Sequence, residues 1–214
     1  MGRGPGKFDL SLATLGLRYW KPLTKIRFFI SAGTPPQNFT VLPATNSPYV
    51  YIPVADDCQR INHTDCGKSR GVSNFGNRAS PGFQSNASST WELIGLYEVD
   101  VDRDLGYAGN GISGYETIGL GSNSTSDAVF LGKQVVTAYA SPDRWVGQLG
   151  LGTRELTFRQ NERPNSTLSS LKVDGIIPSL SFGYTAGASY RRYCDQEARL
   201  LQSVDVIRFN ESQR

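Results

Sequence analysis

The sequence predicts an all-β protein. Its 214 residues include 23 glycines and 11 prolines, which separate short runs of β-branched and aromatic residues. The clearest pair of runs, residues 39–43 and 49–53, flanks the turn Ala44-Thr45-Asn46-Ser47. Apolar residues make up 38% of the chain, and no apolar run approaches the roughly 20 residues that a membrane helix needs. This composition favours strands and turns over helical bundles or disorder.

The first strand is expected near residues 27–32, before a Gly33-Thr34-Pro35 turn, and the strand–turn–strand of residues 39–53 follows it. Residues 56–90 are polar and rich in Asn, Ser and Gly, which is typical of surface loops. Residues 127–140 are expected to form a hairpin that returns at residues 133–136. Further on, the pattern predicts a helix at 169–174, a closing strand at 176–182 and a short helix capped by Asp195.

Two motifs match the beginning of known ligand-binding patterns, but the residues that follow do not complete those patterns. Acidic residues alternate with other residues from Glu98 to Asp104, as at the start of an EF-hand, but Leu105 and Gly111 stand where that loop needs Gly and Glu. A solvated strand face explains the alternation better. Gly109, Gly111 and Gly114 match a dinucleotide fingerprint, but residues 115–120 read as a strand where that fingerprint needs a helix. The three glycines therefore predict a hairpin tip.

Charge and modification motifs indicate the compartment. The 22 basic and 19 acidic residues are scattered, and this pattern argues against nucleic acid as a partner. Six asparagines begin Asn-x-Ser/Thr triplets, more than chance produces, and they indicate a secretory route, although residues 1–25 contain no recognisable signal peptide. The six are Asn38, Asn62, Asn86, Asn123, Asn165 and Asn210.

Five motifs follow one another along the chain: the Gly33-Thr34-Pro35 turn, residues 39–53, Ser88–Trp91, Gly114-Tyr115-Glu116-Thr117 and Trp145–Gly152. Their order resembles the N-terminal lobe of the pepsin-like aspartic peptidases. Residues 179–191 are similar to a filamentous-fungal group that often lacks the catalytic Asp-Thr-Gly. The resemblance covers residues 25–191 and implies a single lobe of the bilobed acid protease fold, between a flexible extension at 1–24 and a divergent tail at 192–214.

The same resemblance predicts that the usual chemistry is missing. Aspartic peptidases use two carboxylates that share one proton. Ala44 stands at the catalytic aspartate position, Asn46 at the loop glycine, and no Asp-Thr-Gly or Asp-Ser-Gly occurs in the chain. Thr45 and Ser47 keep the positions that hold the loop together, and Asn46 tolerates the positive φ that a glycine would adopt there. No catalytic residue is therefore expected, and neither a metal nor another cofactor.

The resemblance also suggests further roles. Cys58 and Cys66 are expected to form a small disulfide loop, while zinc binding would need more ligands than the single histidine, His63, adds. Cys194 has no assigned partner. The candidate cleft and flap residues are Tyr49, Tyr51, Tyr107, Gly109, Gly111 and Tyr115.

Three hypotheses follow from the sequence. The first is a secreted or cell-surface, non-catalytic lobe that binds a peptide or protein chain. The second is an aspartic endopeptidase whose catalytic aspartate is misassigned to Ala44. The third is a piece of a two-lobed protein, whose partner is the missing second lobe. The third also predicts unpaired strand edges near residues 25–30 and 176–182.

Overall fold

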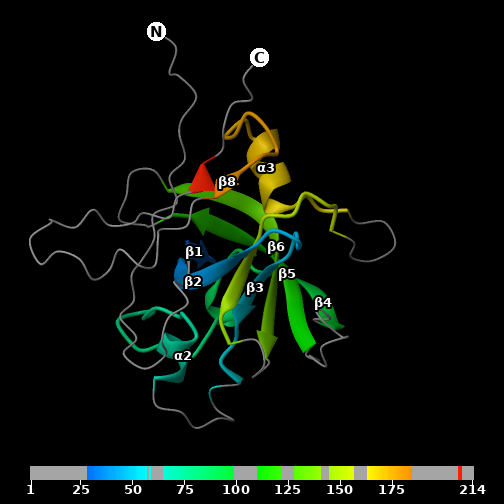
Figure 1. The fold of residues 1–214 in the computed structure, drawn as a ribbon. Coiled ribbons are helices and arrows are strands. Elements are labelled where there is room, and N and C mark those ends of the chain that lie inside the picture. The colour runs from blue at the N-terminus through cyan, green and yellow to red at the C-terminus, as the bar shows by residue number, and fades with distance from the viewer. Residues whose placement is uncertain are drawn as a thin grey trace, which may run out of the picture.

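A computed structural model describes residues 28–56, 58, 65–98, 110–121, 128–140, 145–156, 163–184 and 207–208 (Figure 1). The N-terminal extension, the acidic run after Glu98 and the helix expected from Asp195 lie outside the described residues. The elements, in chain order, are β1 Phe28–Ala32, β2 Gln37–Ala44, β3 Val50–Pro53, α2 Cys66–Ser69, the 3-10 helix η1 Ser85–Ala87, β4 Glu92–Glu98, β5 Asn110–Leu120, β6 Val129–Ala140, β7 Gly147–Gly150, α3 Thr167–Val173, β8 Gly183–Tyr184 and β9 Ile207–Arg208.

The described residues form a single all-β lobe, as the sequence predicts. Seven strands make one sheet in the order β1-β2-β7-β3-β6-β5-β4, and β1 also pairs with β5, so the sheet closes on itself. Strand β5 makes this closure possible because it is long: its first part pairs with β4, and its last three residues pair with β1. In Figure 1, α3 and α2 lie at opposite ends of the sheet.

The core lies inside the closed sheet. Alternate residues of β1 and β2 point into it, with Phe28, Ile30, Phe39 and Val41 all buried. Strand β3 is buried along its whole length, as expected for a central strand between β6 and β7. Helix α3 adds two buried leucines, Leu168 and Leu171, to the same core.

Two of the reverse turns expected from the sequence do not form where they were predicted. Residues 129–140 form one continuous strand, not a hairpin, because Lys133 adopts a φ of 50° and produces a β-bulge where a reverse turn was expected. Gly111 and Gly114 lie within β5, paired with β4 and β6, so they do not form a hairpin tip. The connection between β4 and β5, residues 99–109 with Gly109, lies outside the described residues.

The helix prediction near residue 170 is correct in type but starts two residues late. Ser166 is the N-cap, and its side chain accepts a hydrogen bond from the amide of Ser169. Gly175, at a φ of 70°, ends the helix. The expected strand at 176–182 is absent, because residues 176–180 form bends. Ile177 is buried in the core, and Phe182 packs against the core.

The expectation about unpaired edges is also corrected. Strand β1 pairs with both β2 and β5, and residues 176–182 form no strand. Among the described strands of the large sheet, β4 is the one at its end. Residues 56–90 are more than surface loops, because Arg70, Val72 and Phe83 in this segment are buried.

Candidate functional site

The candidate site is the turn that follows β2, held against β7. The two strands run parallel, and Ala44 is the register partner of Gly150. Beyond the strand ends, the amide of Leu151 donates to the carbonyl of Ala44 (2.8 Å), and the amide of Gly152 donates to the carbonyl of Ser47 (3.0 Å). The glycine-rich segment therefore supports the turn from both ends.

The turn and the glycine segment are in backbone contact. An ideal Cβ placed on Gly150 would lie 2.4 Å from the carbonyl carbon of Pro48 and 2.6 Å from the amide nitrogen of Tyr49. The turn can approach this closely only because residue 150 has no side chain. The glycine at position 150 thus allows the turn to pack directly against the backbone at the end of β7.

The side chains on the turn offer hydrogen-bonding groups but no carboxylate. Thr45 and Asn46 are exposed, and Ala44 presents a methyl group. Ser47 binds the turn internally, since its hydroxyl oxygen accepts a hydrogen bond from the amide of Tyr49 (3.3 Å). The predicted role of Asn46 is wrong: its φ is not positive, so the turn forms without a left-handed residue there.

The one buried acidic residue among those the structure describes is Glu116 on β5, which is 1% exposed. Its Oε1 accepts hydrogen bonds from the hydroxyl of Thr90 and from the amide of Thr117. The hydroxyl of Thr90 also contacts the side chain of Thr34 (3.2 Å), and Ser88 accepts from the Thr34 amide. Glu116 thus belongs to a polar cluster around the Gly33–Thr34 turn, and a single carboxyl cannot form a two-carboxylate dyad.

The aromatic cleft candidates pack mainly against one another and the sheet. Tyr51 is 6% exposed and lies edge-to-face with Tyr139, and Tyr49 stacks on Tyr51 with a centroid separation of 5.9 Å. Tyr115 is half-buried against the small cluster of Ile94, Val135 and Leu156. Gly111 is buried within β5, whereas Tyr107 and Gly109 lie outside the described residues.

The sequons differ in accessibility. Asn86 and Asn165 are exposed, and Asn38 is half-buried within β2. Asn62, Asn123 and Asn210 lie outside the described residues, as do Cys194 and His63. Two of the predicted asparagines are therefore open to modification in the folded protein.

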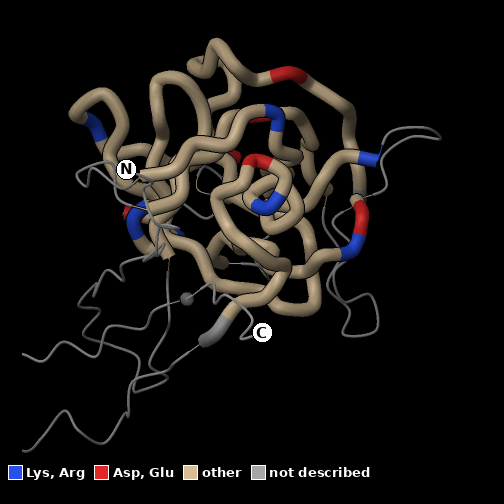
Figure 2. Tube along the Cα trace, turned by 90° about the horizontal axis from the view of Figure 1, so that it is seen from above, with Lys and Arg blue, Asp and Glu red and all other residues tan. Residues whose placement is uncertain are grey.

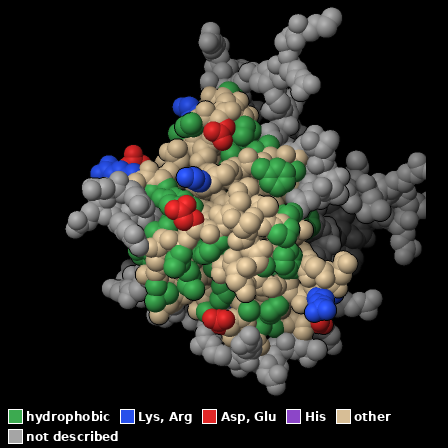
Figure 3. Space-filling model, turned by 180° about the vertical axis from the view of Figure 1, so that it is seen from behind, with side chains coloured by type: hydrophobic (Ala, Val, Ile, Leu, Met, Phe, Trp, Pro, Cys, Tyr) green, Lys and Arg blue, Asp and Glu red, His purple; other side chains and the backbone are tan. Residues whose placement is uncertain are grey.

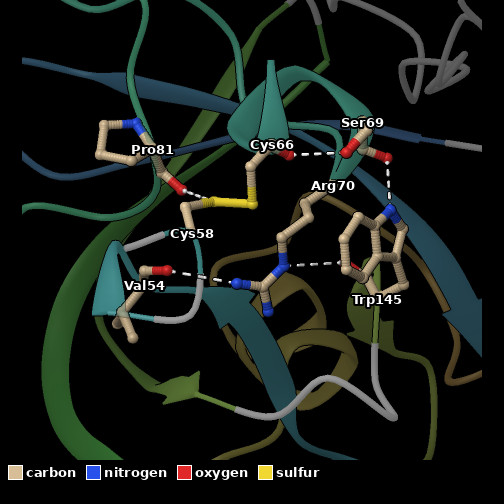
Figure 4. Close-up of a disulfide and its surroundings, with 7 residues drawn as sticks. All are labelled: Val54, Cys58, Cys66, Ser69, Arg70, Pro81 and Trp145. Carbon is tan, nitrogen blue, oxygen red and sulfur yellow. Dashed lines mark hydrogen bonds between the residues drawn. A yellow bond between two sulfur atoms is a disulfide. The ribbon is translucent and has the colours of Figure 1, made fainter. Parts of the chain in front are cut away.

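The predicted disulfide is confirmed, and it lies beside a buried arginine that the sequence reasoning missed (Figure 4). Cys58 and Cys66 are bonded, with Cα atoms 5.4 Å apart. Arg70 is 1% exposed; its Nε donates to the carbonyl of Trp145 (3.2 Å) and its Nη1 to that of Val54 (3.3 Å). The indole of Trp145 in turn donates to the carbonyl of Ser69 (3.1 Å). These contacts tie the disulfide loop to β3 and to the start of the β7 segment.

The surface around these features carries mixed charge. In the described part of the chain, basic and acidic residues alternate around the molecule (Figure 2). The face turned away from the viewer in Figure 1 shows apolar side chains in small patches with few charged groups between them (Figure 3). Neither view shows the dense basic stripe typical of a nucleic-acid interface.

No protein-family model matches the sequence, and no curated protein matches it either. The described residues contain no cluster of three or more His, Cys, Asp or Glu side chains suited to a metal ion. None of the described helices is long and apolar enough to cross a membrane.

Proposed function

We propose that this chain is a non-catalytic, pepsin-like lobe of a secreted glycoprotein, and that it binds a peptide or protein segment in an extended conformation. The observation that carries the proposal is the turn at Ala44. Its backbone is held by hydrogen bonds to Leu151 and Gly152, while the residue at the position of the expected carboxylate is a methyl group. A turn whose backbone is held in place but which lacks the carboxylate supports a binding role better than it supports hydrolysis.

Exposed apolar side chains on and beside strand β4 favour an extended ligand. Leu93 and Leu96 on β4 are 63% and 68% exposed, and Ile112, the register partner of Leu96 on β5, is 44% exposed. Among the described strands, β4 lies at the end of the sheet. An extended segment can lie along these exposed residues and place its own apolar side chains against them.

The secretory part of the proposal rests on two further features. The Cys58–Cys66 disulfide is typical of an oxidising compartment, and Asn86 and Asn165 stand exposed in their sequons. Together they favour secretion or display at the cell surface over a reducing compartment.

The binding proposal predicts a specific loss of affinity. A permanently unfolded, carboxymethylated and fluorescently labelled protein serves as the extended probe, and fluorescence anisotropy measures its binding to the purified chain. Leu96→Lys should weaken binding about tenfold, which is roughly 1.4 kcal/mol, because the charge replaces an apolar contact at the strand. Val173→Lys is the matched control, since Val173 is 73% exposed on α3, and it should change affinity less than about twofold. The absence of saturable binding, or an equal effect of both substitutions, would contradict the proposal.

A further inference from the structure

A hollow of about 510 Å³ lies between α3 and the β5–β6 part of the sheet, away from the turn at Ala44. This volume lies within the range of roughly 300–1,000 Å³ that small-molecule sites occupy. Its lining combines an aromatic ring with groups able to form hydrogen bonds, among them Tyr115, Lys133, Gln134, Asn165, Ser170 and Asp174. This combination of one aromatic surface and several polar groups suits a sugar better than an apolar ligand.

The bulge in β6 shapes one wall of this hollow. Lys133 sits at a φ of 50°, and the next residue, Gln134, is 5% exposed. The side-chain amide of Gln134 donates to the carbonyl of Gly132 (3.1 Å) and to the hydroxyl of Ser170 (3.0 Å), which fixes its orientation. Its carbonyl oxygen has no hydrogen-bond partner among the residues that the structure describes. A buried acceptor of this kind is costly unless a donor reaches it.

Asn165 lines the same hollow and is exposed, and it begins the sequon Asn165-Ser166-Thr167. Its position is fixed because the next residue is the N-cap of α3, whose leucines are buried in the core. A sugar attached to its side-chain nitrogen would therefore start at the hollow itself.

We propose that Asn165 carries an N-linked glycan whose first N-acetylglucosamine packs into this hollow. In its formation the amide nitrogen of Asn165 bonds to C1 of the sugar and loses a proton, while the diphosphate of a lipid-linked oligosaccharide donor leaves. The sugar ring then packs on Tyr115, and its acetamide N–H and hydroxyls meet polar groups of the lining such as the carboxylate of Asp174. The inference depends on the secretory part of the proposed function.

The first test measures protection of the sugar. The full chain is secreted from a eukaryotic host, and an amidase that cleaves the bond between asparagine and sugar is applied to the native protein. Site-resolved mass spectrometry should show release from Asn165 at least tenfold slower than from Asn86, with equal rates once the protein is unfolded. Equal rates in the native protein overturn the inference.

The second test compares Asn165→Gln with Asn86→Gln. Asn165→Gln should lower the melting temperature of the glycosylated protein by about 2–4 °C, whereas Asn86→Gln should leave it within about 1 °C. After enzymatic removal of all sugars, the Asn165→Gln variant should melt with the wild type. Equal melting temperatures of the two glycosylated variants overturn the inference. Sugar on Asn86 but not on Asn165 also overturns it and leaves the secretory proposal standing, whereas no sugar on either overturns both.

Discussion

Replacing Arg70 with methionine should lower the free energy of unfolding by about 3 kcal/mol, a large share of the roughly 5–15 kcal/mol of a typical domain. Methionine keeps part of the apolar stem but removes the two donors that reach the carbonyls of Val54 and Trp145. Each buried carbonyl without a donor costs about 1–3 kcal/mol. The guanidinium also lies 5.7 Å from the ring centroids of both Tyr139 and Trp145, and these contacts are lost as well.

Denaturant unfolding with matched variants tests this expectation. Arg154→Met removes an exposed arginine and should change stability by less than about 0.5 kcal/mol. Arg70→Lys should also destabilise, because an ammonium group cannot reproduce the planar fork that reaches two carbonyls. If Arg70→Met unfolds at the same denaturant concentration as the wild type, Arg70 does not hold the disulfide loop to the sheet.

Gly150→Ala should destabilise the lobe by about 3 kcal/mol, because the new methyl group meets backbone that cannot move aside. The Cβ would lie 2.4 Å from the carbonyl carbon of Pro48 and 2.7 Å from the carbonyl oxygen of Ser47, so the turn after Ala44 must shift. The chain can accommodate the methyl group only by separating β7 from the turn. The hydrogen bond from Gly152 to Ser47 would then be weakened.

Gly132→Ala provides the matched control for this variant. Gly132 lies in β6, and a Cβ placed there would have no atom of the described residues beyond its chain neighbours within 4 Å, so the stability of this variant should differ from the wild type by less than about 0.5 kcal/mol. The comparison uses denaturant midpoints at an unchanged slope. A Gly150→Ala variant as stable as Gly132→Ala would mean that the turn is not packed against β7 as described.

The features that could be predicted from sequence are those determined by local turn chemistry. The strand–turn–strand around Ala44 was recognisable because short β-forming runs meet turn residues there, whereas Trp145–Gly152 was singled out by its resemblance to a pepsin-family motif. The short spacing between Cys58 and Cys66 also fits the disulfide that the structure shows. Each of these features depends on residues close together in the chain.

The errors arose where contacts distant in sequence decide the structure. Gly132 and Lys133 look like a turn, but pairing with β5 holds β6 straight through them as a bulge. Arg70 follows a polar loop, and nothing near it in the sequence reveals that Val54 and Trp145 bury it.

Glu116 was not predicted to be buried, although the residues around it contain a pattern that indicates burial. It shares the period-two face of the buried Ile118 and Leu120, which would have indicated an inward-pointing carboxyl. The sequence could therefore suggest that Glu116 is buried. Its hydrogen bonds to Thr90 and Thr117 required the structure.

The central claim is that the turn at Ala44 keeps its structure but lacks the catalytic carboxylate. The most direct test of this claim is an acid-pH cleavage assay on the purified chain, with a denatured protein as substrate. The assay is run with and without a transition-state inhibitor of aspartic peptidases. We expect no inhibitor-sensitive cleavage by the wild type or by Ala44→Asp, since that substitution restores only one of the two carboxylates that the mechanism needs. Inhibitor-sensitive cleavage by the wild-type chain would contradict the assignment of Ala44 to the catalytic position, and with it the non-catalytic function proposed for this lobe.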